Sequence, residues 1–385
     1  MIWIGIKMLV GERGKFLSMV AGVFFAAMII TQQSSIFMGI LSRTFSFLTD
    51  TNQADIWVMD PKVQFVDDIK PLQSTKLLLV RGISGVDWAE PLYKGIIKAR
   101  LPSGTFQSCN VIGIDDATLL GGPSKMVQGN LSDLRRADSV IVDEVGAKGK
   151  LATKPCPTCP SIPLKIGDIL ELNDRRAYVV GISSVTRTFQ SQPVIHTTYS
   201  RATNFAPQER KQLSFIMVKA KDGVDKSELT KRITAQTGLA AYTREEFIDK
   251  TRNYFLKYTG IPINFGISVL LGFVIGTAIA GQSFFSFTTD NLKYFGTLKA
   301  MGATGSQLTT MVVAQAIIVG MLGYGLGIGV ASQFYYISLN SELAFKMIWQ
   351  IPIISCTAVV VICVLSALLS IRKVIKLEPA IVFRS

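Results

Sequence analysis

The stretch FLSMVAGVFFAAMIITQQSSIFMGILS, residues 16–42, decides the fold class because it carries no charged residue over its whole length. A helix needs about 20 apolar residues to cross the hydrocarbon core of a bilayer. Three later runs also reach this length, at 258–289, within 299–342 and at 347–371. The sequence therefore predicts a membrane protein with four transmembrane α-helices and a large α+β extracytoplasmic domain between helices 1 and 2.

The composition agrees with a membrane protein. Charged residues make up 17% of the 385 residues, whereas about 25% is usual for a soluble domain. The net charge of +13 is spread along the chain, and no cluster of basic residues interleaved with aromatic ones is visible. Such a cluster would mark a nucleic-acid binder, so we expect no nucleic-acid partner.

Lysine and arginine in the short flanks of the hydrophobic runs set the orientation, because cytoplasmic loops carry an excess of them. One set of flanks holds Lys7, Arg13, Lys15, Lys293, Lys299, Arg372, Lys373, Lys376 and Arg384. The opposite flanks hold only Arg43 and Lys346. We therefore expect both termini and the middle loop in the cytoplasm, with 43–260 and 339–348 outside.

These expectations divide the chain into segments. They are a cytoplasmic amphipathic N-terminal helix (1–15), transmembrane helix 1 (16–42), the α+β domain (43–260), transmembrane helix 2 (261–289), a cytoplasmic loop and helix (290–307), transmembrane helix 3 (308–338), a short outer loop (339–348), transmembrane helix 4 (349–371) and a cytoplasmic tail (372–385). A cleaved signal peptide has an apolar region of about 7–15 residues. The first run is longer, which favours an uncleaved anchor.

Runs that are rich in β-branched and aromatic residues and bounded by Gly, Asn or Asp predict strands in the inserted domain. They lie at 54–60, 109–114, 139–144, 168–173, 176–182 and 213–220. Asn173-Asp174 reads as a hairpin turn between two of these strands. Helical spacing predicts one helix at 226–238, ending at Gly238, and another beginning near Thr243. Pro262 is expected to bend the chain where it enters the membrane.

No enzymatic constellation is visible. The sequence holds no G-x-x-x-x-G-K-[ST] phosphate loop and a single histidine, His196, without evident triad or metal partners. We expect neither a catalytic residue, a metal site nor a cofactor in this chain. The glycines at 323, 325, 327 and 329, and the Gly272-x-x-x-Gly276 pair, are typical of close helix packing in lipid.

Cys156 and Cys159 lie in the proline-rich loop KPCPTCPSIP. A disulfide is the favoured interpretation outside the cytoplasm. A redox-active pair lacks a thioredoxin-like βαβ setting. A zinc site would need two more ligands, and Cys109 is the only other thiol of the domain.

A polar block interrupts the first hydrophobic run and consists of Thr31, Gln32, Gln33, Ser34 and Ser35. Polar groups in hydrocarbon must find partners, so the block should face protein or water. Hydrogen bonding between helices is the structural interpretation. An intramembrane polar seam that receives the headgroup of an amphiphile is the functional one.

The middle loop reads NLKYFGTLKAMGAT at 291–304. Leu292, Phe295, Leu298 and Met301 recur every three residues and so lie near one helical face. Gly302 ends the helix. An amphipathic helix at the inner membrane surface can lie on lipid or dock in the groove of a partner protein.

With this loop, the order of spans and the tail LEPAIVFR (377–384), the sequence resembles the MacB/FtsX-like permeases of ABC transporters, and it looks most like the DevC-type branch. The stretches TGIPINFGISVLLGFVIGTAIAGQ (259–282) and RTFQSQPVIHTTYSRA (187–202) are also similar to that branch. The likeness extends over nearly the whole chain.

The resemblance implies a homodimeric permease of the inner (cytoplasmic) membrane, with its large domain in the periplasm. Two copies of a separate ATPase subunit would bind ATP and Mg, so the chain itself would not be an enzyme. The ATPase-coupling helix would comprise Leu292, Lys293, Phe295, Gly296, Leu298, Lys299, Met301, Gly302 and Ala303. We expect Phe295, Leu298 and Met301 to pack into a groove on the ATPase.

The DevC-type branch further implies mechanotransmission, in which ATP binding moves helices that reshape the outer domain. A periplasmic adaptor and a TolC-like outer-membrane channel would complete a tripartite efflux system for a glycolipid or another amphiphile. Two alternatives share the topology: an FtsX-like transmitter that controls cell-wall hydrolases without transport, and a lipoprotein-release permease.

Overall fold

The structure is a computed structural model that describes residues 2–153, 159–207, 212–339 and 341–375 of the chain. The chain forms two compact units. Residues 1–40 and 260–385 form the first, here called the helical unit. Residues 41–259 form the second, here called the inserted unit.

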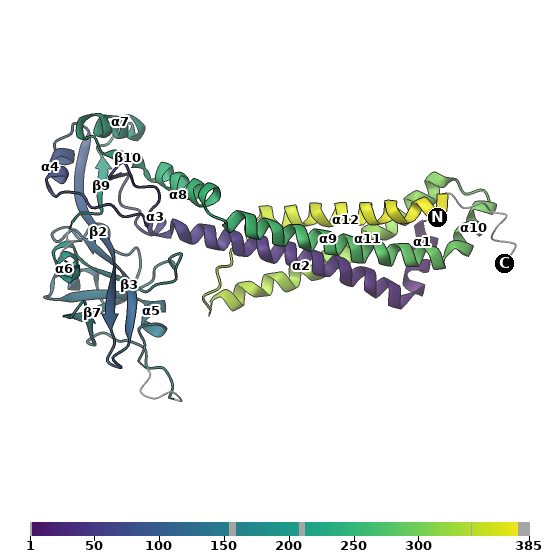
Figure 1. Ribbon diagram of the computed structural model, residues 1–385, viewed down its shortest axis with the longest axis horizontal. Coiled ribbons are helices and arrows are strands. Elements are labelled where there is room, and N and C mark those ends of the chain that lie inside the picture. The colour runs from purple at the N-terminus through teal and green to yellow at the C-terminus, as the bar shows by residue number, and fades with distance from the viewer. Residues whose placement is uncertain (1, 154–158, 208–211, 340, 376–385) are drawn as a thin grey trace. The chain divides into compact units, whose positions relative to one another are not determined.

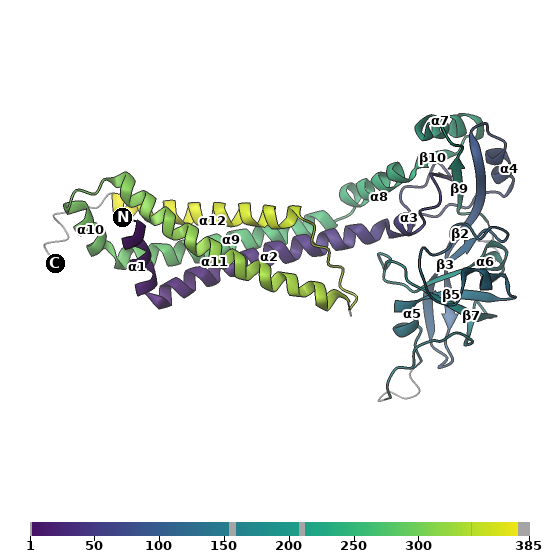
Figure 2. The same cartoon turned by 180° about the vertical axis from the view of Figure 1, so that it is seen from behind.

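The helical unit consists of long apolar helices. Its elements are α1 (Ile2–Gly11), α2 (Arg13–Thr44, entering the inserted unit at its end), α9 (Ile261–Asp290), α10 (Leu292–Ala300), α11 (Gly305–Leu339) and α12 (Gln350–Ile375). Within the described residues, α2, α9, α11 and α12 are long and apolar enough to cross a membrane. Figures 1 and 2 show these four helices running alongside one another. The predicted fold class is confirmed in this respect.

Small residues let these helices approach closely. A Cβ atom added to Gly327 of α11 would lie 2.7 Å from Ala27 Cβ and 2.9 Å from the backbone oxygen of Phe24, both in α2. One added to Gly323 would lie 2.8 Å from Val23. The packing interpretation is thus confirmed for these glycines. At Gly325 and Gly329 an added Cβ would meet no atom of the described chain within 4 Å, so for these two the packing interpretation stays a prediction.

The inserted unit is built on one mixed sheet. Its strands are β1 (Ile56–Met59), β2 (Val86–Arg100), β3 (Phe106–Ile114), β4 (Met126–Gln128), β5 (Ser139–Asp143), β6 (Ile169–Leu172), β7 (Arg175–Ser183), β8 (Val194–Thr198), β9 (Phe215–Ala220) and β10 (Ala240–Thr243). The strand order is β10-β1-β9-β2-β3-β8-β5-β7-β4, and β6 pairs with both β2 and β7. The first half of β2 pairs with β9 and its second half with β3, so this one strand joins both parts of the sheet.

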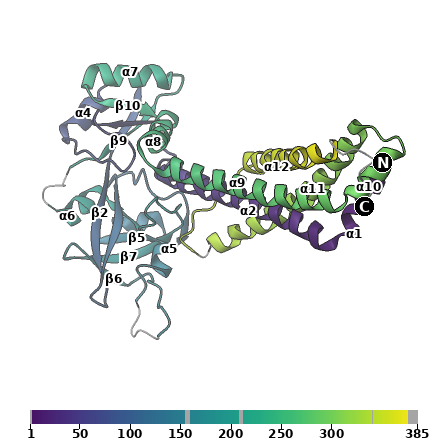
Figure 3. The ribbon, with the colours of Figure 1, turned by 45° about the vertical axis from the view of Figure 1, so that its right-hand side comes forward.

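Helices cover the sheet at several places. They are α3 (Ser46–Asp50), α4 (Thr75–Arg81), the 3-10 turn η1 (Leu131–Arg135), α5 (Glu144–Lys148), α6 (Tyr199–Phe205), α7 (Lys226–Thr237) and α8 (Arg244–Tyr258). Val80 of α4 and Leu229 and Ile233 of α7 are buried together against β1, β2 and β9, and Figure 3 shows both helices at the β9 end of the sheet. This packing gives the large α+β domain that the sequence predicted between the first two spans.

Local signals explain why several sequence predictions are confirmed. Each predicted strand overlaps one of β1, β3, β5, β6, β7 or β9. Asn173 and Asp174, with φ of 50° and 63°, form the two-residue turn between β6 and β7, as expected for residues that tolerate positive φ. Thr243 caps α8, because its Oγ1 accepts from the backbone N–H of Glu246 at 3.2 Å.

Pro262 does not bend a continuous helix. The helix α8 ends at Tyr258, and its C-cap residue, Thr259, is extended. Pro262 then lies in the first turn of α9, where a missing backbone N–H costs nothing because that donor has no partner inside the helix.

The one histidine is buried in the inserted unit. His196 of β8 is 3% exposed, and its Nδ1 has no hydrogen-bond partner among the described atoms. Burial lowers the pKa of His196 to about 4 because a charged imidazolium is costly away from water. This histidine is therefore a neutral core residue, which agrees with the absence of evident partners in the sequence.

The buried histidine predicts a loss of stability in mild acid. The unfolded chain binds a proton below a pKa near 6.5, whereas the folded unit resists protonation until pH 4. The contribution of His196 to the free energy of unfolding is thus fully present above pH 6.5. It falls by about 3 kcal/mol as the pH drops from 6.5 to 4. Burial raises the pKa of Asp50 and Asp143. These carboxyl groups bind protons more readily in the folded unit, so they make it more stable as the pH falls, which is the opposite of the histidine's effect. The effect of the histidine is isolated by comparing hydrogen exchange of the β8 amides in the wild type and in His196→Leu at each pH. Equal pH profiles of the two proteins would contradict the assignment.

Candidate coupling surface

The loop between α9 and α11 folds as the short helix α10, as the spacing of its apolar residues suggested. At its start, the Asn291 side chain donates to the Phe287 carbonyl at 2.9 Å and to Glu12 Oε1. At its end, Gly302 adopts φ of +96°, a conformation that favours glycine. Thr304 and Gln307 then cap α11 through reciprocal bonds of 3.3 and 3.0 Å. Both ends of α10 are thus fixed.

The prediction that Phe295 and Leu298 dock on another protein is wrong. Phe295 is 0% and Leu298 is 8% exposed, and both belong to the core of the helical unit. Gly296 and Ala303 are also buried, and Leu292 packs partly buried against the same core. The apolar side of α10 therefore packs within its own chain, so Phe295 and Leu298 are not available to fill a groove on another protein.

The opposite side of α10 is exposed. Tyr294 is 63% and Met301 is 71% exposed, and Thr297 between them is also exposed. The spacing of 294, 297 and 301 puts these three residues on one side of the helix. Lys293 and Gly302 are exposed, while Lys299 is half-buried and has an interaction partner. Tyr294, Thr297 and Met301 are here called the exposed face of α10, and its tyrosine was missing from the predicted residue set.

A polar network holds α10 in place. Lys15 of α2 pairs with Glu12 at 2.6 Å and also with Asp290, the last residue of α9. Glu12 accepts in turn from the buried Asn291. Glu12 and Lys15 are distant in sequence from Asp290 and Asn291, so no local motif reveals the network. It ties the start of α10 to the junction between α1 and α2.

Asn291→Ala is expected to loosen α10. The substitution removes two side-chain hydrogen bonds of a residue that is 3% exposed, each contributing about 1 kcal/mol. Amide hydrogen exchange in 292–300 should become at least about tenfold faster. The matched control is Thr297→Ala, which removes only a bond to the Lys293 carbonyl in the same helix. Equal exchange in the two variants would show that the network does not position α10.

The polar block of α2 is partly explained by helix packing. Thr31 is fully buried, and its Oγ1 donates to Ser355 Oγ of α12 at 2.8 Å. Hydrogen bonding between helices is therefore confirmed for Thr31. Ser35 is also buried, whereas Gln32, Gln33 and Ser34 are half-buried. A role of the block as a headgroup seam stays a prediction.

The cysteine loop is only partly described. Cys159 is disulfide-bonded, but Cys156 lies outside the described residues, so their pairing stays a prediction. Burial raises the pKa of the Cys109 thiol to about 12, which makes it a poor nucleophile and metal ligand. Within the described ranges, no group of three or more His, Cys, Asp or Glu residues is arranged to hold a metal ion. The tail motif at 377–384 also falls outside the described part of the chain.

Comparisons with solved structures reveal similar proteins. The periplasmic region of MacB from Actinobacillus actinomycetemcomitans is 19% identical, with a TM-score of 0.38, over 55% of this chain and 97% of that one. The extracellular domain of the noncanonic ABC-type transporter YknZ from Gram-positive bacteria is 12% identical, with a TM-score of 0.34, over 49% of this chain and 98% of that one. None of the curated proteins compared matches the chain significantly.

Two family descriptions match, and together they include most of the chain. The MacB-like periplasmic core domain matches residues 16–236, more than half of the sequence. The FtsX-like permease C-terminal region matches residues 265–379, which contain α10. The chain therefore belongs to the MacB/FtsX family of ABC transporter permeases and is a multi-pass membrane protein with an extracytoplasmic domain between its first two spans.

Proposed function

We propose that this chain couples ATP binding and hydrolysis by a separate ATPase subunit to movement of its inserted unit. Permeases of this family generally work with ATPase subunits, and neither matching family description is that of an ATPase domain. The observation that carries the proposal is the exposed face of α10. Tyr294 and Met301 are large, exposed side chains on a helix whose other side packs in the core of the helical unit.

The proposal implies an orientation. The exposed face must lie in the cytoplasm to meet an ATPase, so both termini would be cytoplasmic and the inserted unit would lie in the periplasm. The excess of lysine and arginine in the predicted cytoplasmic flanks supports this orientation. It would make the chain a subunit of the inner membrane, and we propose that it acts as a homodimer with two ATPase copies that hold ATP and Mg.

The finer role that we propose is mechanotransmission in a tripartite exporter of a glycolipid or another amphiphile, as in the DevC-type branch. A periplasmic adaptor and a TolC-like outer-membrane channel would complete the assembly. The match to the FtsX-like C-terminal region also suits a second candidate, a transmitter that controls cell-wall hydrolases. Co-purification separates the two, since an adaptor with an outer-membrane channel supports export and a hydrolase or its activator supports signalling.

A photocrosslinker tests the docking assignment. Benzoylphenylalanine in place of Tyr294 is expected to form an adduct with an ABC ATPase subunit in intact cells. The same probe in place of Leu326, a 58% exposed residue within α11, should give no such adduct. Absence of an ATPase adduct from position 294, or equal yields from the two positions, would remove the basis of the proposal.

A further inference from the structure

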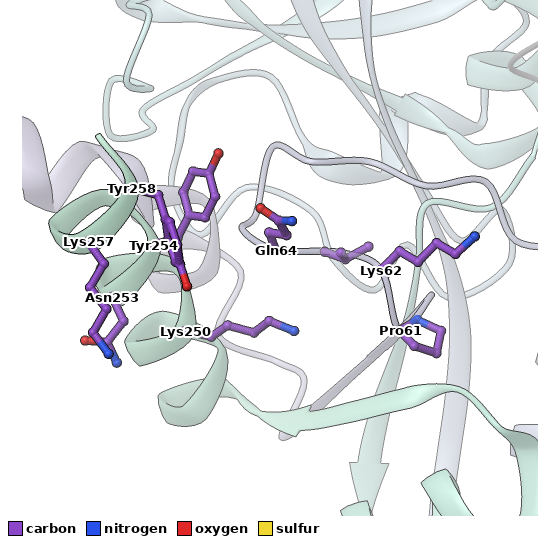
Figure 4. A pocket seen from close by; sticks show the side chains of 9 residues that line it. Pro61, Lys62, Gln64, Lys250, Asn253, Tyr254, Lys257 and Tyr258 are labelled. Carbon is purple, nitrogen blue, oxygen red and sulfur yellow. The ribbon is translucent and has the colours of Figure 1, made fainter. Parts of the chain in front are cut away.

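The inserted unit has a cleft that plays no part in the proposed coupling. It encloses about 790 Å³ between residues 61–64 and the second half of α8, within the range of about 300–1,000 Å³ that is usual for ligand sites. In Figure 4, Tyr254, Lys257 and Tyr258 of α8 stand on one side and Lys62 and Gln64 on the other. Its shape suits a ligand the size of a lipid headgroup.

The cleft is positively charged. Three lysines line it, Lys62, Lys250 and Lys257, and no aspartate or glutamate does. Lys62 and Lys257 are exposed and form no ion pair with any residue that the structure describes. Of the nearby acids, Asp249 pairs with Arg252 at 2.9 Å, and Asp60 accepts from the backbone N–H of Lys62 but forms no ion pair with its ammonium group. Unneutralised ammonium groups around a concave site favour an anionic ligand.

One lysine is held in position. Lys250 Nζ donates to Tyr242 Oη at 2.9 Å and lies 4.3 Å from the centre of the same ring. An ammonium group has three N–H donors, so two remain for a ligand. Figure 4 shows this side chain extending from α8 between the two walls. A fixed donor inside the cleft, with two exposed lysines at its walls, is suited to the several oxygens of a phosphate group.

The aromatic wall of the cleft suits a membrane interface. The ring of Phe65 stacks on Tyr254 at 4.5 Å between centroids, and Tyr254 lies 5.6 Å from Tyr258. Tyr258 is 76% exposed. Tyrosine is enriched at the headgroup level of membranes, where its ring meets apolar matter and its hydroxyl meets water.

One residue of the cleft wall is close in sequence to a membrane-length helix. Tyr258 precedes Ile261, the first residue of the membrane-length helix α9, by three residues. At about 3.8 Å between consecutive Cα atoms, Tyr258 lies at most about 11 Å from the start of that helix. The headgroup layer is several ångströms thick on each side of the hydrocarbon core, so Tyr258, which lines the cleft, is within reach of lipid headgroups.

We propose that this cleft binds the phosphate-bearing headgroup of an anionic phospholipid, whose acyl chains stay in the bilayer. The three lysines bind the phosphate, and Tyr254 and Tyr258 cover the glycerol. The bound lipid would hold α8 at the membrane surface next to the span it leads into. The inference is independent of the ATPase assignment, because none of its residues belongs to α10.

A crosslinking experiment on the full chain tests the site. Benzoylphenylalanine replaces Gln64, and the protein is reconstituted in vesicles of phosphatidylcholine with a minor share of phosphatidylglycerol. Mass spectrometry of the crosslinked peptide then reports which lipid is attached. Phosphatidylglycerol should be enriched over its share in the vesicle. Lys62→Gln/Lys257→Gln should weaken phosphatidylglycerol binding about fivefold per lysine, so that the adducts approach the bulk lipid ratio.

The control removes the same charge elsewhere. Lys221→Gln/Lys231→Gln changes two exposed lysines outside the cleft and should leave the enrichment intact. Adducts in the bulk lipid ratio, or an enrichment equally weakened by both double variants, would overturn the proposal. Complete displacement of lipid by soluble glycerol phosphate would overturn it as well, since the site would then be one for a soluble anion.

Discussion

Tyr294→Glu/Met301→Glu is expected to abolish stimulation of the ATPase subunit, with the coupled rate falling at least about thirtyfold. Both side chains are more than 60% exposed on α10, and central aromatic and large apolar contacts contribute about 2 kcal/mol or more each to protein interfaces. A glutamate there would also bury a charge in the contact. The measurement is ATP hydrolysis by the reconstituted complex, together with the thermal stability of the permease.

Two comparison variants make this result specific. Leu78→Glu/Tyr178→Glu adds the same charge at exposed positions of the inserted unit and should leave stimulation unchanged. Phe295→Glu introduces a charge into the core of the helical unit, where Phe295 is 0% exposed, and should destabilise the fold. If the Tyr294/Met301 variant keeps full stimulation while folded, the exposed face of α10 is not the docking surface.

Gly327→Leu is expected to disrupt the helical unit, whereas Gly329→Leu is expected to be tolerated. The two glycines lie two residues apart in α11. A Cβ at Gly327 would lie 2.9 Å from the Phe24 carbonyl oxygen and 3.0 Å from the Met28 nitrogen. These are backbone atoms, so the helices themselves must separate. Overpacking of this kind costs about 1–3 kcal/mol or more.

The control, Gly329→Leu, introduces the same side chain in the same helix at a position that does not contact α2. An added Cβ at Gly329 meets nothing within 4 Å, and leucine favours the helix by a few tenths of a kcal/mol or more over glycine. Thermal unfolding of the two variants in the same detergent measures the difference. Equal melting temperatures would mean that α2 and α11 do not pack through Gly327.

Much of the fold can be predicted from the sequence because the sequence patterns that indicate spans, strands and turns are local. An uncharged run of membrane length predicts a span from composition alone. Runs of β-branched and aromatic residues bounded by turn residues such as Asn173-Asp174 predict strands and hairpins. The glycines of α11 mark the limit of such signals. Their spacing predicts packing, but only the position of α2 distinguishes Gly327, which touches it, from Gly329, which does not.

The candidate site shows the same limit. The recurrence of Leu292, Phe295 and Leu298 correctly predicts an amphipathic helix, but an apolar face packs equally well against its own chain or another protein. Burial of Phe295 and Leu298 in the helical unit decides between them, and this depends on residues distant in sequence. The bonds of Asn291 to Glu12 and of Lys15 to Asp290 are equally non-local, so no spacing rule finds them.

The central claim is that nucleotide binding by a partner moves the inserted unit of this chain. Spin labels at Gln236→Cys and Ser338→Cys, in a Cys356→Ser background, report the distance between the two units by pulsed electron resonance. The account predicts that this distance changes when ATP binds the complex with the ATPase subunit, and that ATP changes nothing in the permease alone. A change caused by ATP in the permease alone, or no change in the complex, would contradict it.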